Sequence, residues 1–173
     1  KQANLGFDSG PGNVLMDAWM QKHHQQNFDR DGAWAASGTC NDAWVAHGLN
    51  DPYFKLPAPK STGRDDFDTQ WIEAINRLYP DTPQNIQRSL CELTAQSIAQ
   101  SILKQPAYRH DDEVIVCGGG GHNGFLMQRL EALFKKNLLL STACGIDADF
   151  CEAMGFAWLA QQLRHLHVVL LHQ

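Results

Sequence analysis

The sequence lacks the long apolar runs and the excess of positive charge that mark two broad classes of protein. No stretch of its 173 residues reaches the roughly 20 consecutive apolar residues of a membrane-spanning helix, and no signal peptide is visible. The formal net charge of −5 argues against binding to nucleic acid or to an anionic membrane, because both need a basic surface. The sequence therefore predicts neither a nucleic-acid-binding protein nor a membrane protein.

Cysteines at the spacing of a zinc site or a disulfide framework are also absent. The five cysteines are odd in number, widely scattered, and form no C-x-x-C pair. We therefore expect reduced cysteines in a cytoplasmic protein. The histidines lack partners at ligand spacing, so we interpret His23, His24, His165 and His167 as surface residues and predict no metal site built by the protein.

The composition is that of one folded domain. Hydrophobic residues make up 43% of the chain and charged residues 19%, which is enough apolar material for a core and argues against disorder. Helical spacing of apolar residues follows Pro11, and between Pro83 and Pro106 it predicts one long helix. Short helices are expected near residues 33–36 and 42–47.

Three segments predict the strand, loop and helix order of an α/β layer fold. Leu5–Phe7 is expected to end a strand that leads into a glycine-proline turn. Glu113–Cys117 is a β-branched apolar run typical of a buried parallel strand, and four glycines and a helix over 123–134 follow it. Leu138–Ser141 is expected to form another strand. A last helix is expected over 149–166, with an inward face made by Ala153, Phe156, Ala157, Ala160 and Leu163.

The first glycine-rich loop places a carboxylate at the predicted end of a strand. Asp8 lies between Gly6 and Gly10, and Gly10 and Gly12 allow the backbone to come close to a phosphate. A carboxylate at the mouth of such a loop can act as a general base. It can equally accept hydrogen bonds from the amides of its own turn. The pattern alone leaves both interpretations open.

The second glycine-rich loop, Gly118–Gly121, lies where ligands bind in open α/β sheets, between the carboxyl end of a strand and a helix. Glycines let a nucleotide approach the backbone, and free amides at a helix start favour phosphate. The loop is neither a Walker loop nor a G-x-G-x-x-G motif. A tight strand-to-helix turn without a ligand is the alternative interpretation.

Taken together, these segments resemble the anhydro-N-acetylmuramic acid kinases of the sugar kinase, heat-shock chaperone and actin superfamily. Gly6 to Trp19 is similar to the family segment G-[FY]-D-T-G-P-G-N-x-L-M-D-A-W, with Ser9 in place of threonine. The resemblance extends over about residues 5–160. Further similar segments follow in the family's order at residues 51–54, 59–64, 92–95, 117–123 and 152–160.

The resemblance implies a fold and a domain organisation. Residues 1–160 would form the helix-rich carboxy-terminal lobe of an actin-like ATPase (ribonuclease H-like) α/β fold, without the first strand or strands of that lobe. Residues 161–173 would be a divergent or truncated tail. The amino-terminal lobe, with its own phosphate loop, would be missing and therefore a required partner. Family members tend to form dimers, which makes a homodimer an expectation by analogy.

The resemblance also implies an activity. Water attacks the anomeric carbon of 1,6-anhydro-N-acetylmuramic acid and opens the anhydro bridge, and the released 6-oxygen takes the γ-phosphate of ATP. Mg²⁺ bridges the phosphates. The product is N-acetylmuramic acid 6-phosphate, formed during peptidoglycan recycling. The implied roles are catalytic base for Asp8, phosphate binding for Gly10, Gly12 and Asn13, nucleotide binding for Gly118, Gly119, Gly120 and Asn123, and sugar binding for Glu152.

Each implied role has a rival interpretation. Glu152, at the start of a predicted helix, would also complement the helix dipole. Lys60 and Arg64 are expected to fix a loop more than to touch phosphate. With one lobe absent, we expect little or no kinase activity from the chain alone. A non-catalytic nucleotide- or sugar-binding fragment stays an alternative, and so does a superfamily ATPase without sugar chemistry, although the 60–64 segment and Glu152 favour the muramic kinase family over that ATPase.

Overall fold

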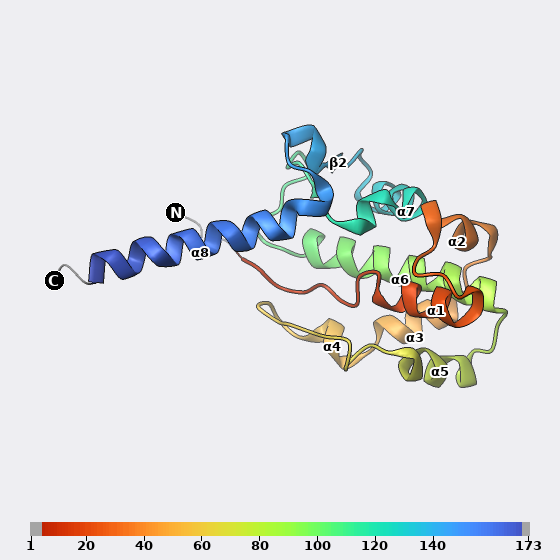
Figure 1. The fold of residues 1–173 in the computed structure, drawn as a ribbon. Coiled ribbons are helices and arrows are strands. Elements are labelled where there is room, and N and C mark those ends of the chain that lie inside the picture. The colour runs from red at the N-terminus through yellow and green to blue at the C-terminus, as the bar shows by residue number, and fades with distance from the viewer. Residues whose placement is uncertain (1–4, 171–173) are drawn as a thin grey trace.

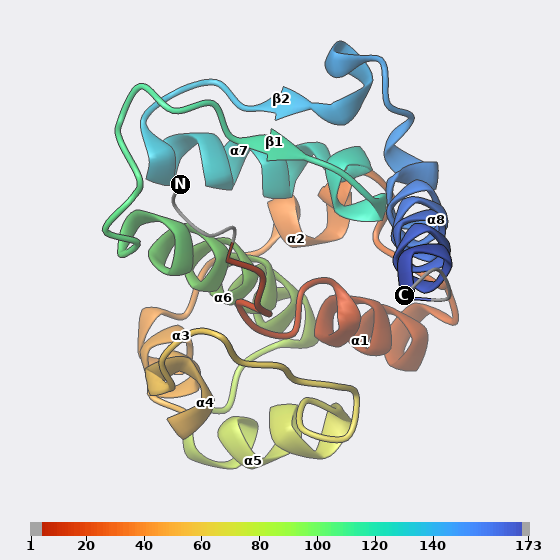
Figure 2. The same cartoon turned by 90° about the vertical axis from the view of Figure 1, so that its left-hand side faces the viewer.

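One long buried helix, α6, organises the molecule. The computed structural model describes residues 5–170, and for residues 163–170 it describes the backbone alone. Figures 1 and 2 show α6 in the middle, with the other helices and a small sheet arranged around it. The helices are α1 (Val14–His24), η1 (Arg30–Gly32), α2 (Ala33–Ser37), α3 (Asp42–Leu49), α4 (Pro52–Lys55), α5 (Thr69–Leu78), α6 (Pro83–Leu103), η2 (Gly119–His122), α7 (Gly124–Phe134), η3 (Ser141–Cys144), η4 (Ala148–Phe150) and α8 (Cys151–Leu170).

The sequence signals at the start of α6 correspond to its observed cap. The Thr82 side chain accepts a hydrogen bond from the amide of Asn85, and Pro83 occupies the first turn, where its missing amide costs nothing. Leu90 and Leu93 are fully buried. The predicted long helix between Pro83 and Pro106 is therefore confirmed.

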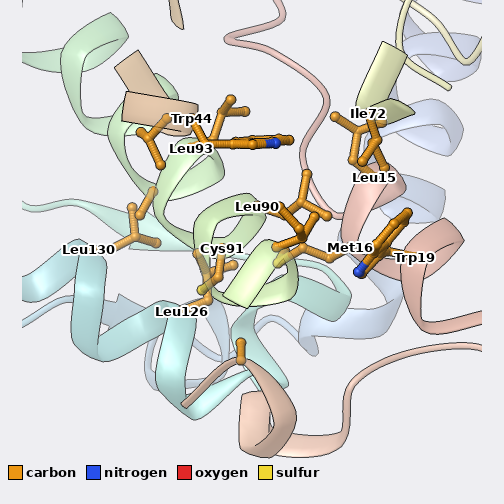
Figure 3. Close-up of a cluster of buried hydrophobic side chains, with 14 of the residues drawn as sticks. Leu15, Met16, Trp19, Trp44, Ile72, Leu90, Cys91, Leu93, Leu126 and Leu130 are labelled. Atoms are coloured by element: carbon orange, nitrogen blue, oxygen red, sulfur yellow. The ribbon is translucent and has the colours of Figure 1, made fainter. Parts of the chain in front are cut away.

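The core forms on several sides of α6. Figure 3 shows Leu90 and Cys91 of α6 between Met16 of α1 and Leu126 of α7. Trp44 of α3 is fully buried, and its indole nitrogen donates to Asn76 Oδ1 at 2.7 Å, so the one polar atom of that ring has a partner. The core thus fixes α1 and α7, which bear the two glycine loops at their amino-terminal ends.

A small parallel sheet accompanies the helices. β1 (Ile115–Val116) pairs with β2 (Leu139–Leu140) in parallel, and α7 lies between them in the chain. The predicted helix-rich α/β class is confirmed to this extent. The predicted strands over Glu113–Cys117 and 138–141 are each only two residues long, and Ile115 is 49% exposed because no further strand covers it within residues 5–170. The prediction of a buried strand there is wrong.

One other local prediction differs from the structure, and three are confirmed. Leu5–Phe7 forms no strand, since the nearest backbone pairing is a single hydrogen bond from the Asp8 amide to the Lys60 carbonyl at 2.9 Å. The short helices near residues 33–36 and 42–47 are confirmed as α2 and α3. His23 and His24 are exposed, as expected, whereas the side chains of His165 and His167 lie outside the described residues.

The last helix is where the prediction of packing is wrong. α8 projects away from the body of the molecule (Figure 1), and Ala153, Ala157 and Ala160 are exposed rather than inward-facing. Phe156 is 72% exposed and Trp158 58%. The side chain of Leu163 lies outside the described residues. Helical periodicity identifies a face, but that face is buried only where another element packs on it. None of the helices described over residues 5–170 has both the length and the apolar character to cross a bilayer.

Candidate functional site

Asp8 is anchored by a loop distant in sequence, not by its own turn. Its Oδ2 accepts hydrogen bonds from Ser61 Oγ and from the Thr62 amide, both at 3.0 Å. The Tyr53 hydroxyl donates to the Asp8 carbonyl at 2.7 Å. Asp8 Oδ1 makes no hydrogen bond to the part of the chain that the structure describes, and the residue is exposed. One carboxylate oxygen is therefore fixed and the other is free to take a proton.

The two glycines that follow Asp8 differ in their surroundings. Gly12 has a φ of 57°, and an added Cβ would meet nothing within 4 Å, so its backbone is open to a ligand. Its carbonyl accepts a hydrogen bond from Thr94 Oγ1 of α6 at 2.8 Å. An added Cβ on Gly10 would lie 2.8 Å from Phe54 Cε1 and 3.1 Å from Ser97 Oγ. Close packing is sufficient to require glycine at position 10.

Two adjoining cavities run from Asp8 along α1. One, of about 250 Å³, is lined by Asp8, Gly10 and Thr62, and the other, of about 400 Å³, is lined by Asp17 and Gln21. Both are also lined by Val14, Arg64 and Phe67. Arg64 forms no salt bridge within the described residues. The structure thus places Arg64 in the cleft rather than in a loop contact, and it adds Asp17, which sequence reasoning missed although it lies in the Gly6–Trp19 segment.

The folded chain disfavours ionisation of the Asp17 carboxyl. Burial raises the pKa of its carboxyl from 3.8 to about 6, the charge of Arg64 opposes that rise, and the charge of Asp29 adds to it. A half-buried carboxylate with a perturbed pKa in a cleft is a typical feature of functional sites. We therefore include Asp17 in the candidate site.

Replacing Asp17 with asparagine is expected to raise the free energy of unfolding near neutral pH. The pKa of the Asp17 carboxyl is raised in the folded chain. Its contribution to the free energy of unfolding is therefore fully present below pH 3.8 and is lost as the pH rises through about 6. The amount by which Asp17→Asn raises the free energy of unfolding should therefore increase between pH 3.8 and about 6. Urea unfolding at several pH values measures it, with exposed Asp65→Asn as the control. A difference that does not change with pH would contradict this account.

The second glycine loop lies against the first. An added Cβ on Gly120 would lie 3.3 Å from Asn13 Nδ2, although the two residues are far apart in the sequence. Gly118 has a φ of 77°, a conformation that favours glycine, and its amide donates to the Ala148 carbonyl at 2.9 Å. A Cβ added to Gly119 would meet nothing within 4 Å. The structure therefore brings the predicted phosphate and nucleotide loops together.

Asn123 has a structural role that is independent of a nucleotide. Its Oδ1 accepts a hydrogen bond from the Leu126 amide at 3.0 Å and caps α7. The same oxygen packs against Gly32, where an added Cβ would lie only 2.3 Å from it. A cap explains this side chain, so its predicted contact with the nucleotide stays a prediction.

Glu152 is exposed and does not line the two cavities beside Asp8. It lies in the first turn of α8, where a negative charge complements the helix dipole. Its neighbour is Cys117, whose thiol pKa is raised by burial, by a hydrogen bond to Cys151, and by the charges of Cys151 and Glu152. Glu152 thus lies at the Gly118 end of the site, and the structure does not join it to Asp8.

The described residues provide single carboxylates rather than a metal cage. Among the side chains that the structure describes, no three of the His, Cys, Asp or Glu residues lie close enough to hold an ion together. Mg²⁺ at phosphoryl-transfer sites is usually held by one or two carboxylates together with phosphate oxygens and water. An ion at this site would therefore be held mainly by the phosphate oxygens of a nucleotide and by water.

Comparisons with known proteins match nearly the whole chain to one family. The family model described as anhydro-N-acetylmuramic acid kinase matches residues 1–168. The curated anhydro-N-acetylmuramic acid kinase of Vibrio parahaemolyticus is 45% identical over 163 residues, which cover 94% of this chain and 43% of the relative. That of Vibrio cholerae is 44% identical, covering 93% and 44%, and that of Pseudomonas paraeruginosa is 48% identical, covering 91% and 43%. The chain spans less than half the length of these relatives.

Proposed function

Because this chain belongs to the anhydro-N-acetylmuramic acid kinase family, we propose that it forms one face of the cleft of an ATP-dependent sugar kinase. The enzyme would open 1,6-anhydro-N-acetylmuramic acid and phosphorylate it to N-acetylmuramic acid 6-phosphate in peptidoglycan recycling. The contact between Asn13 and Gly120 is the observation that supports this proposal most strongly. Through this contact the loop that bears Asp8 lies beside the loop Gly118–Gly121. A sugar kinase needs its sugar and its nucleotide to bind next to each other.

In the proposed mechanism Asp8 is the base. Its free Oδ1 takes a proton from the water that attacks the anomeric carbon, while Ser61 and the Thr62 amide hold Oδ2 and orient the carboxylate. As the water oxygen bonds to the anomeric carbon, the bond between that carbon and the bridging oxygen breaks. The freed oxygen then attacks the γ-phosphate of ATP, the bond between the β- and γ-phosphates breaks, and ADP leaves. Arg64, beside Asp8, is suited to offset the negative charge of the transferring group.

The nucleotide side of the site is assigned to the second loop. We propose that Gly118, Gly119 and Gly120 let ATP approach the backbone, and that the open backbone at Gly12 and the neighbouring Asn13 face its phosphates. Mg²⁺ would offset the charge of the phosphates during transfer. Glu152, near the Gly118 end, is proposed to reach the sugar only when the cleft is complete.

The rest of the cleft would come from an amino-terminal lobe. We propose that residues 1–160 form the carboxy-terminal lobe of an actin-like fold and that residues 161–173 are a tail. The β1-α7-β2 unit and the coverage of the relatives support this arrangement. Five free cysteines fit a cytoplasmic location, and a homodimer is proposed by analogy with the family.

The 173-residue chain alone is expected to show little or no kinase activity. Phosphoryl transfer depends on groups held on both sides of the phosphates, and these residues supply one side. A coupled ADP-release assay with the anhydro sugar measures this, with a full-length relative as the positive control. Turnover near that of the relative would contradict the prediction.

A second measurement tests whether the chain alone binds either ligand of the proposed site. Calorimetry with ATP and with the anhydro sugar tests whether the chain forms any part of the site. Weak binding of either ligand that is lost in Gly120→Leu supports the proposed face, because a bulky side chain there would collide with Asn13. Unchanged binding in that variant would argue against it.

A further inference from the structure

A larger cavity lies away from the cleft, between the second half of α6 and the segment that follows α4. Its volume is about 580 Å³, which is within the usual range for small-molecule sites. The amino-terminal segment, drawn in red, runs between α6 and α4 in Figure 1, and Phe7 of this segment lines the cavity. Lys55 and Lys104 line this cavity and none of the hollows at Asp8 or Asp17, whereas Phe7 and Lys60 also line a hollow of about 440 Å³ that includes Asp8.

Three lysines make this cavity strongly positive. Lys55, Lys60 and Lys104 are three of the seven lysines in a chain whose net charge is −5. No Asp or Glu lines the cavity, and none of the three lysines forms a salt bridge within the described residues. Their positive charges are therefore uncompensated by the part of the chain that the structure describes.

Two contacts with Tyr53 hold the ammonium group of Lys60 in place. Its Nζ donates to the Tyr53 carbonyl at 2.9 Å and lies 4.3 Å from the centre of the Tyr53 ring. Burial lowers the pKa of Lys60, and the charge of Lys104 lowers it further. The two ammonium groups thus repel each other across the cavity, and an anion between them would relieve that repulsion.

The rest of the lining suits an organic anion. Gln100 and Ser101 of α6 provide polar groups, and Phe7 and Phe54 provide aromatic surface. The carboxyl end of α6 opposes an anion with about half an elementary negative charge, which three full positive charges outweigh. The combination of lysines, amide and hydroxyl groups, and aromatic surface is that of a site for a phosphorylated sugar or a similar molecule.

We propose that this cavity binds a small phosphorylated organic anion at a second site, which borders the hollow at Asp8 through Lys60 but includes neither Asp8 nor Arg64, and that this binding is independent of the proposed activity. Lys60 and Lys104 contact the phosphate from opposite sides, and Lys55 adds charge at the edge. Gln100 and Ser101 face the hydroxyl groups of the organic part.

The test is a titration of the 173-residue chain with glucose 6-phosphate at constant ionic strength, followed by NMR of the backbone amides. We expect saturable shifts at Ser101, Lys104 and Gln105. Lys104→Gln should weaken binding about tenfold or more, since a hydrogen bond to a charged group is lost. Lys55→Gln, at the exposed edge, should weaken it less.

A control variant and two control ligands accompany this titration. Lys135→Gln, an exposed lysine elsewhere, should bind as the native chain does, and uncharged glucose should not bind. Inorganic phosphate should give weaker shifts at the same residues. Three results would overturn the proposal. They are shifts that do not saturate, an affinity of Lys104→Gln equal to that of Lys135→Gln, and shifts confined to the loops Gly10–Asn13 and 118–120. The ADP-release assay does not depend on these outcomes, so the proposed kinase function is tested separately.

Discussion

Replacing Asp8 with asparagine is expected to lower turnover about 10²–10⁴-fold in a complete kinase, because the amide cannot accept the proton of the attacking water. The complete enzyme is a chimera of this chain with the part of the Vibrio cholerae relative that it does not cover. Asparagine keeps an oxygen to accept from Ser61 and Thr62, so the loop should stay in place. Steady-state kinetics should show a large fall in kcat with little change in KM.

Asp65→Asn is the matched control for this variant. Asp65 is exposed, lies three residues past Thr62, and makes no side-chain hydrogen bond to the side chains and backbone that the structure describes. Turnover in this control should stay near that of the unmodified chimera. If Asp8→Asn is as active as Asp65→Asn, Asp8 is not the base, and its bonds to Ser61 and Thr62 only hold a loop.

Replacing Glu92 with alanine is expected to lower the free energy of unfolding by about 2–4 kcal/mol. Its carboxylate is 5% exposed and accepts hydrogen bonds from Arg88 at 3.0 Å, Gln96 at 3.0 Å and Arg129 at 2.8 Å. The pair with Arg129 joins α6 to α7, and α7 supports the second glycine loop. Loss of the carboxylate leaves two guanidinium groups without their partner.

Denaturant unfolding measures this loss against Glu73→Ala. Glu73 pairs with Lys22 on the surface, where such an ion pair contributes about 1 kcal/mol or less. Glu92→Gln, which keeps the shape and removes the charge, should fall between the two. Equal destabilisation by the alanine variants would show that the Glu92 network contributes nothing beyond a surface pair.

The same network has a defined pH dependence. Burial acts to raise the pKa of Glu92, but the hydrogen bonds from Arg129, Gln96 and Arg88 outweigh it and lower the pKa below 4.5. Because the pKa of Glu92 is lower in the folded chain than in the unfolded chain, the ionised carboxylate stabilises the fold above pH 4.5. This stabilisation is lost as the pH falls through the pKa of the folded chain. The difference between the native chain and Glu92→Gln should therefore shrink only in acid.

Local signals in the sequence were sufficient for most helices. Thr82 and Pro83 mark the start of α6, and the spacing of Leu90 and Leu93 marks its buried face, so both could be predicted. Asn123 caps α7 two residues after the glycine run. These features depend on residues within one or two turns of each other, which a pattern can capture.

Features set by distant neighbours could not be predicted in the same way. The apolar face at the start of α8 is a clear pattern, but Phe156 is exposed because burial depends on a packing partner. Arg64 reaches the Asp8 cavity, and Lys104 meets Lys60, only through the path of the folded chain. Asp17 differs from the other acidic residues through its burial, which the sequence does not display.

The most direct test of the central claim is product analysis with the chimera. Incubated with ATP and 1,6-anhydro-N-acetylmuramic acid, it should convert the sugar to a species heavier by one water and one phosphoryl group, detected by mass spectrometry. The Asp8→Asn chimera should form that species far more slowly. Release of ADP without a phosphorylated sugar would instead contradict the claim that this chain forms the sugar-kinase face, and would favour an ATPase without sugar chemistry.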